Sequence, residues 1–122
     1  MRVVVVSESF LPTTNGVTTS VRKVLDHLAA LGHEAMVIVP AAGAPKAYAG
    51  FRVHEVPAIA YRQFPVGLPN PTVQKLIADF RPDVVHAASP FLLGAQAIAA
   101  ANRLDIPTVA IFQTDVAGYA RR

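Results

Sequence analysis

Polar side chains that could do chemistry occur at three places in the chain, and each place follows or ends an apolar run. They are residues 8–16, His86 and residues 113–115. Carboxylate, amide, hydroxyl and imidazole groups can hydrogen-bond sugar hydroxyls, and a carboxylate can also act as a general base, whereas the amide of Gln113 cannot. We therefore predict Asp115 and Gln113 as catalytic residues and Glu8, Asn15, His86 and Thr114 as substrate-binding residues.

Gly16 stands at the start of an amphipathic helical pattern over residues 17–31. The first turn of a helix offers free backbone N–H groups and the positive end of the dipole, which suit a phosphate, and glycine lets a ligand approach the backbone. The alternative is a glycine that only permits a tight turn. The segment is neither G-x-G-x-x-G nor a P-loop, which disfavours a nicotinamide dinucleotide-binding fold and a nucleotide triphosphatase.

Each of the other candidates also has a structural interpretation. His86 can bond a substrate hydroxyl, or it can be a satisfied, half-buried histidine. Glu8 can bind sugar hydroxyls or be solvated in its loop. Thr114 or Asp115 can cap a following helix, and Ser89 is expected to be the N-cap of the helix that follows it.

The elements that must position these residues alternate along the chain. Strands are predicted over residues 2–7, 35–39, 51–56, 83–87 and 108–112, helices over 17–31, 72–80 and 91–103, and irregular segments over 40–50 and 57–70. Asn70 and Pro71 should begin the second helix, and Gly32 should end the first. The alternation predicts an α/β, Rossmann-like, doubly wound parallel sheet with its ligand at the carboxyl edge.

Composition excludes several other classes. The 122 residues contain no cysteine, so disulfides and cysteine metal clusters are excluded, and no acidic or histidine set has metal-ligand spacing; we expect no metal and no cofactor. The net charge of +3 forms no basic stripe, so no nucleic-acid partner is expected. The sequence shows neither a signal peptide nor an apolar run of membrane-spanning length, so a cytoplasmic protein is expected.

Four segments in order resemble the N-terminal half of glycosyltransferase family 4: residues 3–17, 31–34, 81–94 and 112–115. The last segment, with the residues after it, resembles the GDP-mannose-dependent α-mannosyltransferases that act on glycolipids in actinobacteria. It is also similar to sulfoquinovosyl- and glucosyl-diacylglycerol synthases. The resemblance implies a retaining hexosyltransferase of the GT-B fold that transfers mannose from GDP-mannose to a lipid or saccharide acceptor.

The same resemblance implies two Rossmann-like domains facing each other across a cleft. Residues 1–122 would be the N-terminal, acceptor-side domain, and the C-terminal donor domain would be absent, because the chain ends before the helix that should cover its last strand. Gly16 would approach the donor phosphates. Gln113 stands where many members have histidine, which implies a positioning role beside Asp115. Residues 57–70 would form an acceptor-side loop, with peripheral contact at the inner face of the plasma membrane.

Two alternatives stay open. The chain can be a non-catalytic, flavodoxin-like binding module that works as 122 residues, or part of another GT-B enzyme such as a nucleotide-sugar epimerase. The first predicts a cooperatively unfolding monomer. The sequence of a C-terminal domain would discriminate the second.

Overall fold

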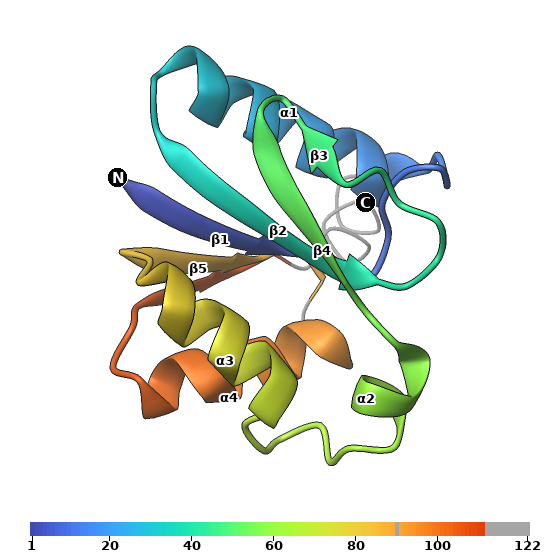
Figure 1. Cartoon of the computed structure of the whole chain (residues 1–122), viewed down its shortest axis with the longest axis vertical. Helices are drawn as coiled ribbons and strands as arrows, with labels where there is room; N and C mark the ends of the chain where they lie inside the picture. The colour runs from blue at the N-terminus through green and yellow to red at the C-terminus, as the bar shows by residue number, and fades with distance from the viewer. Residues whose placement is uncertain (90, 112–122) are drawn as a thin grey trace, which may run out of the picture.

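A computed structural model describes residues 1–89 and 91–111, which form one sheet with helices on both faces (Figure 1). The strands are β1 (Arg2–Val6), β2 (Glu34–Pro40), β3 (Ala47–Tyr48), β4 (Phe51–Val56), β5 (Val84–Ala87) and β6 (Thr108–Ala110). Their order is β3-β4-β2-β1-β5-β6, and every pair is parallel except β3 with β4. The predicted α/β, Rossmann-like architecture is confirmed, with β3 as an antiparallel addition.

The helices divide between the two faces of the sheet. Helix α1 (Gly16–Ala30) covers one face, and α2 (Ala58–Arg62), α3 (Pro71–Phe80) and α4 (Leu93–Arg103) cover the other (Figure 1). In β1, Val3 and Val5 join the core under α1, whereas Val4 and Val6 join the core under α3 and α4. A strand covered on both faces needs apolar side chains in both directions, which explains the unbroken valine run.

Local signals set the ends of two helices as predicted. The Asn70 side chain accepts hydrogen bonds from the backbone N–H groups of Thr72 (3.0 Å) and Val73 (3.4 Å), and Pro71 is the first residue of α3. Gly32 follows the C-cap of α1 with a φ of 78°, a left-handed conformation that glycine adopts without strain.

Two irregular segments were predicted wrongly. Residues 40–50 contain β3, which pairs with β4 through a two-residue turn at Ala49 and Gly50, both with positive φ. Residues 57–70 contain α2, whose five residues are too few to show a helical period in the sequence. Both elements depend on contacts with the rest of the fold more than on their own pattern.

The start of α4 also differs from the prediction. The helix begins at Leu93 after Leu92, and no side chain of the N-cap residue closes it, so the assignment of Ser89 as N-cap is wrong. Ser89 is nevertheless buried. The predicted strand over residues 108–112 is observed as β6 up to Ala110, and residue 112 lies outside the described residues.

A buried amide pair anchors the segment between β4 and α3. The Asn70 Nδ2 donates to Gln96 Oε1 (2.8 Å) and to the carbonyl oxygen of Ala60 (2.7 Å). The Gln96 Nε2 donates to the carbonyl oxygens of Tyr61 (2.7 Å) and Phe64 (3.1 Å). Because both buried amides have partners, they hold this segment against α4 without the cost of an unsatisfied polar group.

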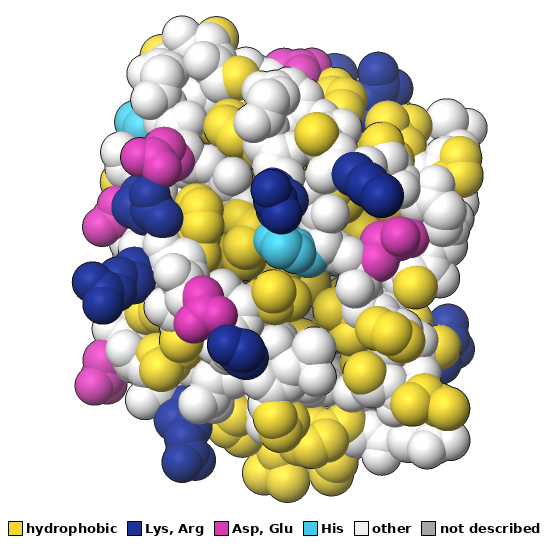
Figure 2. Space-filling view, viewed as in Figure 1, with side chains coloured by type: hydrophobic (Ala, Val, Ile, Leu, Met, Phe, Trp, Pro, Cys, Tyr) yellow, Lys and Arg dark blue, Asp and Glu magenta, His cyan; other side chains and the backbone are white. Residues whose placement is uncertain are grey.

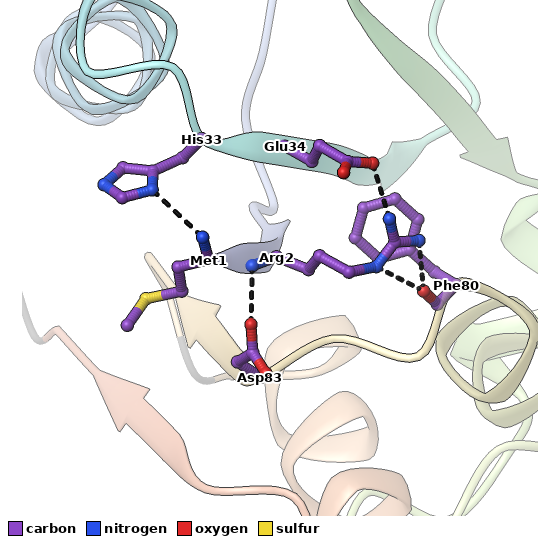
Figure 3. A network of polar contacts seen from close by, with 6 residues as sticks. All are labelled: Met1, Arg2, His33, Glu34, Phe80 and Asp83. Carbon is purple, nitrogen blue, oxygen red and sulfur yellow. Dashed lines mark hydrogen bonds and ion pairs between the residues drawn. The ribbon is translucent and has the colours of Figure 1, made fainter.

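At the amino edge of the sheet, charged groups satisfy one another (Figure 3). The Arg2 guanidinium lies 4.2 Å from the centre of the Phe80 ring, donates from Nε to the Phe80 carbonyl oxygen (3.0 Å) and pairs with Glu34. The backbone N–H of Arg2 donates to the Asp83 carboxylate (2.7 Å). These polar groups, at or next to the amino ends of β1, β2 and β5, therefore pair with one another within the protein.

Candidate functional site

The topology places the candidate site at the carboxyl ends of β1 and β5. These strands are neighbours, and the chain leaves β1 towards β2 on one side and β5 towards β6 on the other. The end of β5 is joined to β1 by the backbone hydrogen bond from Ala88 N to Val6 O (2.8 Å) and to β6 by that from Ile111 N to Ala87 O (2.9 Å). Such a switch point is where open α/β sheets bind ligands, because the loops separate there.

Asn15 closes the first turn of α1. Its Oδ1 accepts a hydrogen bond from the Thr18 N–H (2.9 Å), its backbone oxygen accepts from the Thr19 N–H (3.0 Å), and its Nδ2 donates to the Ser9 hydroxyl (3.3 Å). The structure thus gives Asn15 the role of an N-cap. Its contact with substrate stays a prediction.

Gly16 is the exposed first residue of this turn. A Cβ added to it would meet no atom within 4 Å, and its φ is not in the left-handed region. The N–H groups of Gly16 and Val17 make no hydrogen bond with another described residue. Neither a left-handed backbone conformation nor packing among the described residues requires a glycine here, and its approach to a phosphate stays a prediction.

Glu8 is half-buried, and its side chain reaches from the loop after β1 to α4, which follows β5. Its Oε1 accepts a hydrogen bond from the Gly94 N–H at 3.1 Å, in the first turn of α4. Its second carboxylate oxygen makes no hydrogen bond with a described residue. The contact of Glu8 with sugar hydroxyls stays a prediction, but the alternative of a solvated loop residue does not describe this geometry.

His86 lies in the middle of β5, in register with Val5 of β1 and Val109 of β6. It is half-buried, and its imidazole makes no hydrogen bond with another described residue. Burial lowers the pKa of His86 below its ordinary value, because a charged imidazole loses hydration there. The neutral ring therefore keeps one donor and one acceptor for a partner near pH 7.

The predicted catalytic segment cannot be placed. Gln113, Thr114 and Asp115 lie outside the described residues, which end at Ile111, directly after β6. Within residues 1–89 and 91–111, no group of three or more histidines and acidic residues could hold a metal ion. In the same part of the chain, no helix is long and apolar enough to cross a membrane.

The sequence analysis did not identify Gly94, whose backbone N–H donates to Glu8. A Cβ on Gly94 would lie 2.2 Å from the Ser89 carbonyl oxygen, so only glycine fits between the helix and the loop that precedes it. The one signal was a glycine in the first turn of an alanine-rich helix, where its low helix propensity calls for a reason.

Comparison with known proteins gives the family. Residues 14–122 match Glycosyltransferase Family 4. The chain belongs to this family. It is 50% identical over 98% of its length to the GDP-mannose-dependent alpha-mannosyltransferase of Mycolicibacterium smegmatis, and 47% identical over its whole length to that of Corynebacterium glutamicum. It is 31% identical over 98% of its length to the alpha-monoglucosyldiacylglycerol synthase of Acholeplasma laidlawii.

The chain spans about a third of the length of these relatives, 34%, 31% and 31% respectively. The family predicted from four short motifs is confirmed, as is the Rossmann-like fold that it implies. Neither a flavodoxin-like binding module nor a nucleotide-sugar epimerase receives support from these relatives. The glycosyltransferase family therefore sets the chemistry in which the site is interpreted.

Proposed function

We propose that this chain is the acceptor-side part of a retaining glycosyltransferase that transfers mannose from GDP-mannose to a glycolipid or saccharide acceptor. The family match and the mannosyltransferase relatives support the reaction class. The glucosyldiacylglycerol synthase relative supports a lipid acceptor. A donor domain outside these 122 residues would complete the site.

The open start of α1 carries the mechanistic part of the proposal. The N–H groups of Gly16 and Val17 make no hydrogen bond with another described residue, and the absence of a side chain on the exposed Gly16 would leave room for a diphosphate. During transfer, negative charge grows on the departing diphosphate, so fixed N–H donors stabilise the transition state more than the ground state. The helix dipole adds to this effect.

The remaining site residues take supporting roles in the proposal. His86, kept neutral by burial, would accept or donate a hydrogen bond to a sugar hydroxyl. Asp115 would act near the reacting sugar, with Gln113 and Thr114 positioning it. No metal ion is required, because backbone N–H groups and cations of the donor domain would neutralise the diphosphate.

Gly16→Trp tests the diphosphate site in the whole enzyme. The indole would fill the open space, so GDP-mannose affinity and transfer should fall by about 100-fold or more while the protein stays folded. Gly67→Trp is the matched control for GDP-mannose affinity alone, since Gly67 also has open space and no left-handed φ but lies in the segment between α2 and α3, which is assigned to the acceptor side. Calorimetric titration with GDP-mannose that shows equal affinities for both variants would refute the assignment.

We further propose a peripheral contact between the segment joining β4 to α3 and an anionic membrane at the cytoplasmic face. Figure 2 shows hydrophobic side chains gathered over α2 and the residues that follow it. Ile59 is 75% exposed and Leu68 52% exposed, and a hollow of about 440 Å³ is lined by Phe64, Leu68 and Arg103, among others. Apolar side chains beside basic ones suit the surface of an anionic bilayer.

Vesicle sedimentation tests the membrane contact. Ile59→Ser should weaken binding to vesicles that contain phosphatidylglycerol, and the double variant Ile59→Ser with Arg62→Glu should weaken it further, because both apolar and electrostatic attraction are then lost. Binding of the wild-type protein to neutral phosphatidylcholine vesicles gives the reference. Equal sedimentation of all variants with anionic vesicles would exclude this surface.

A further inference from the structure

Two helices begin at the same edge of the sheet, and each needs partners for its first N–H groups. Helix α1 follows β1 and α4 follows β5, so both N-termini lie at the carboxyl edge beside the switch point. The cap of α1 comes from its own chain segment, through Asn15. The N-cap residue of α4, Leu92, has an apolar side chain and makes no side-chain cap hydrogen bond.

Glu8 supplies the missing partner from a distant part of the chain. Its carboxylate accepts the Gly94 N–H at 3.1 Å, across a separation of 86 residues. A negative charge at a helix N-terminus is favoured by the dipole, and a hydrogen bond to a carboxylate is stronger than one to a neutral acceptor. The contact therefore joins the loop after β1 to the first turn of α4.

Gly94 fixes the place of this contact from the other side. The residue is buried, and a Cβ on it would lie 2.2 Å from the Ser89 carbonyl oxygen. The first turn of α4 thus packs directly against the loop that leaves β5. Moving the Gly94 N–H would require moving that loop, so Glu8 is tied to a well-defined point.

We propose that Glu8 is a positioning residue, whose carboxylate latches the loop after β1 to α4 and so fixes the relative position of the two sides of the site. This inference rests on the proposed function. The loop that Glu8 begins also contains Asn15 and leads into Gly16, and it is cross-linked internally by the bond from Asn15 Nδ2 to the Ser9 hydroxyl (3.3 Å). The latch therefore sets where the proposed diphosphate-binding turn lies relative to the loop after β5. Glu8 acts through Gly94 and not through a bond to sugar.

A pair of substitutions at position 8 separates the two roles. Glu8→Gln keeps an oxygen that can accept the Gly94 N–H, whereas Glu8→Ala removes it. In the whole enzyme, Glu8→Gln should keep kcat with GDP-mannose within about threefold of wild type, and Glu8→Ala should lower kcat by about 10- to 100-fold. A Glu8→Gln variant as impaired as Glu8→Ala, with a raised KM for the acceptor, would show a direct substrate contact and overturn the proposal.

Hydrogen exchange gives a readout that does not depend on turnover. The Gly94 amide should exchange about tenfold faster in Glu8→Ala than in wild type, and Glu8→Gln should restore most of the protection. Unchanged exchange in Glu8→Ala would overturn the latch even if activity falls. If wild type transfers no mannose at all, the proposed function fails, while this measurement still decides whether the latch exists.

Glu55 provides a matched control. Its carboxylate also accepts backbone N–H groups, from Ala42 (2.9 Å), Gly43 (3.0 Å) and Ala44 (3.1 Å), but it ties the loop after β2 to β4. Glu55→Ala removes three bonds of the same kind, against one in Glu8→Ala, away from the junction of β1 and β5. It should leave kcat and Gly94 exchange unchanged, and a loss of kcat equal to that of Glu8→Ala would contradict a specific role for Glu8.

Discussion

The two helix starts at the carboxyl edge of the sheet use glycine for opposite purposes. At α1, Gly16 faces open space, and a neutral amide from Asn15 caps the helix. At α4, a side chain on Gly94 would have no space, and the carboxylate of Glu8 accepts a hydrogen bond from the Gly94 N–H group. The difference is that the start of α1 stays open among the described residues, whereas the start of α4 is closed by a side chain from a distant part of the protein.

Substitution of each glycine by alanine should give the largest contrast. Gly94→Ala should lower the free energy of unfolding by about 3 kcal/mol, because the new methyl group meets a backbone carbonyl that cannot move freely. Gly16→Ala should change it by less than about 1 kcal/mol, since its methyl group meets nothing. Urea unfolding measures both values. Equal losses would show that the two sites do not differ as described.

Asn15→Asp would give α1 the kind of charge that α4 already has. Aspartate caps helices as well as asparagine does, so stability should hold, but the added charge should weaken GDP binding by about tenfold. Calorimetry with GDP on the whole enzyme measures the change. Ala78→Asp on the exposed side of α3 is the control for charge alone. If the control weakens GDP binding as much as Asn15→Asp, the diphosphate does not lie at α1.

Thr18→Val tests an unused polar group in the first turn of α1. The Thr18 hydroxyl is buried and has no hydrogen-bond partner among the described residues. Replacing it with a methyl group of similar size should raise the free energy of unfolding by about 1 kcal/mol. A clear loss of stability in urea unfolding would mean that this hydroxyl has a partner elsewhere.

The smallest effect should come from the pH dependence of stability that His86 of β5 contributes. Its folded pKa is lowered by burial, so the unfolded state binds more protons as the pH falls below about 6.5, and stability is lost in that direction. His86→Gln should make this loss shallower. Part of it should remain, because burial and Arg52 also lower the pKa of His54. Identical pH profiles of stability would contradict the assigned shift.

The predictable part of the fold is the part whose signals are continuous along the chain. The valine run of β1 and the apolar period of α1 each contain enough residues to reveal their type. Strand β3 has two residues and α2 has five, so neither can display a period. They form because β4 offers an edge to pair with and because the Asn70–Gln96 amides hold the segment against α4.

The candidate site divides in the same way. Gly16 was predicted as the start of a helix at the carboxyl edge, because the residues before and after it are sufficient for that inference. The cap role of Asn15 also lies within four residues and was overlooked. The contact between Glu8 and Gly94 joins residues 86 positions apart, and no local sequence pattern predicts it.

The sequence by itself determined the class of fold, the order of the main elements and, through four motifs, the glycosyltransferase family. Those properties follow from hydrophobic periods and short motifs, which are local. Only the tertiary structure decided which helix start is open and which is closed. That choice depends on where distant backbone and side-chain atoms come within hydrogen-bonding distance, and only the packed sheet brings β1 and β5 side by side.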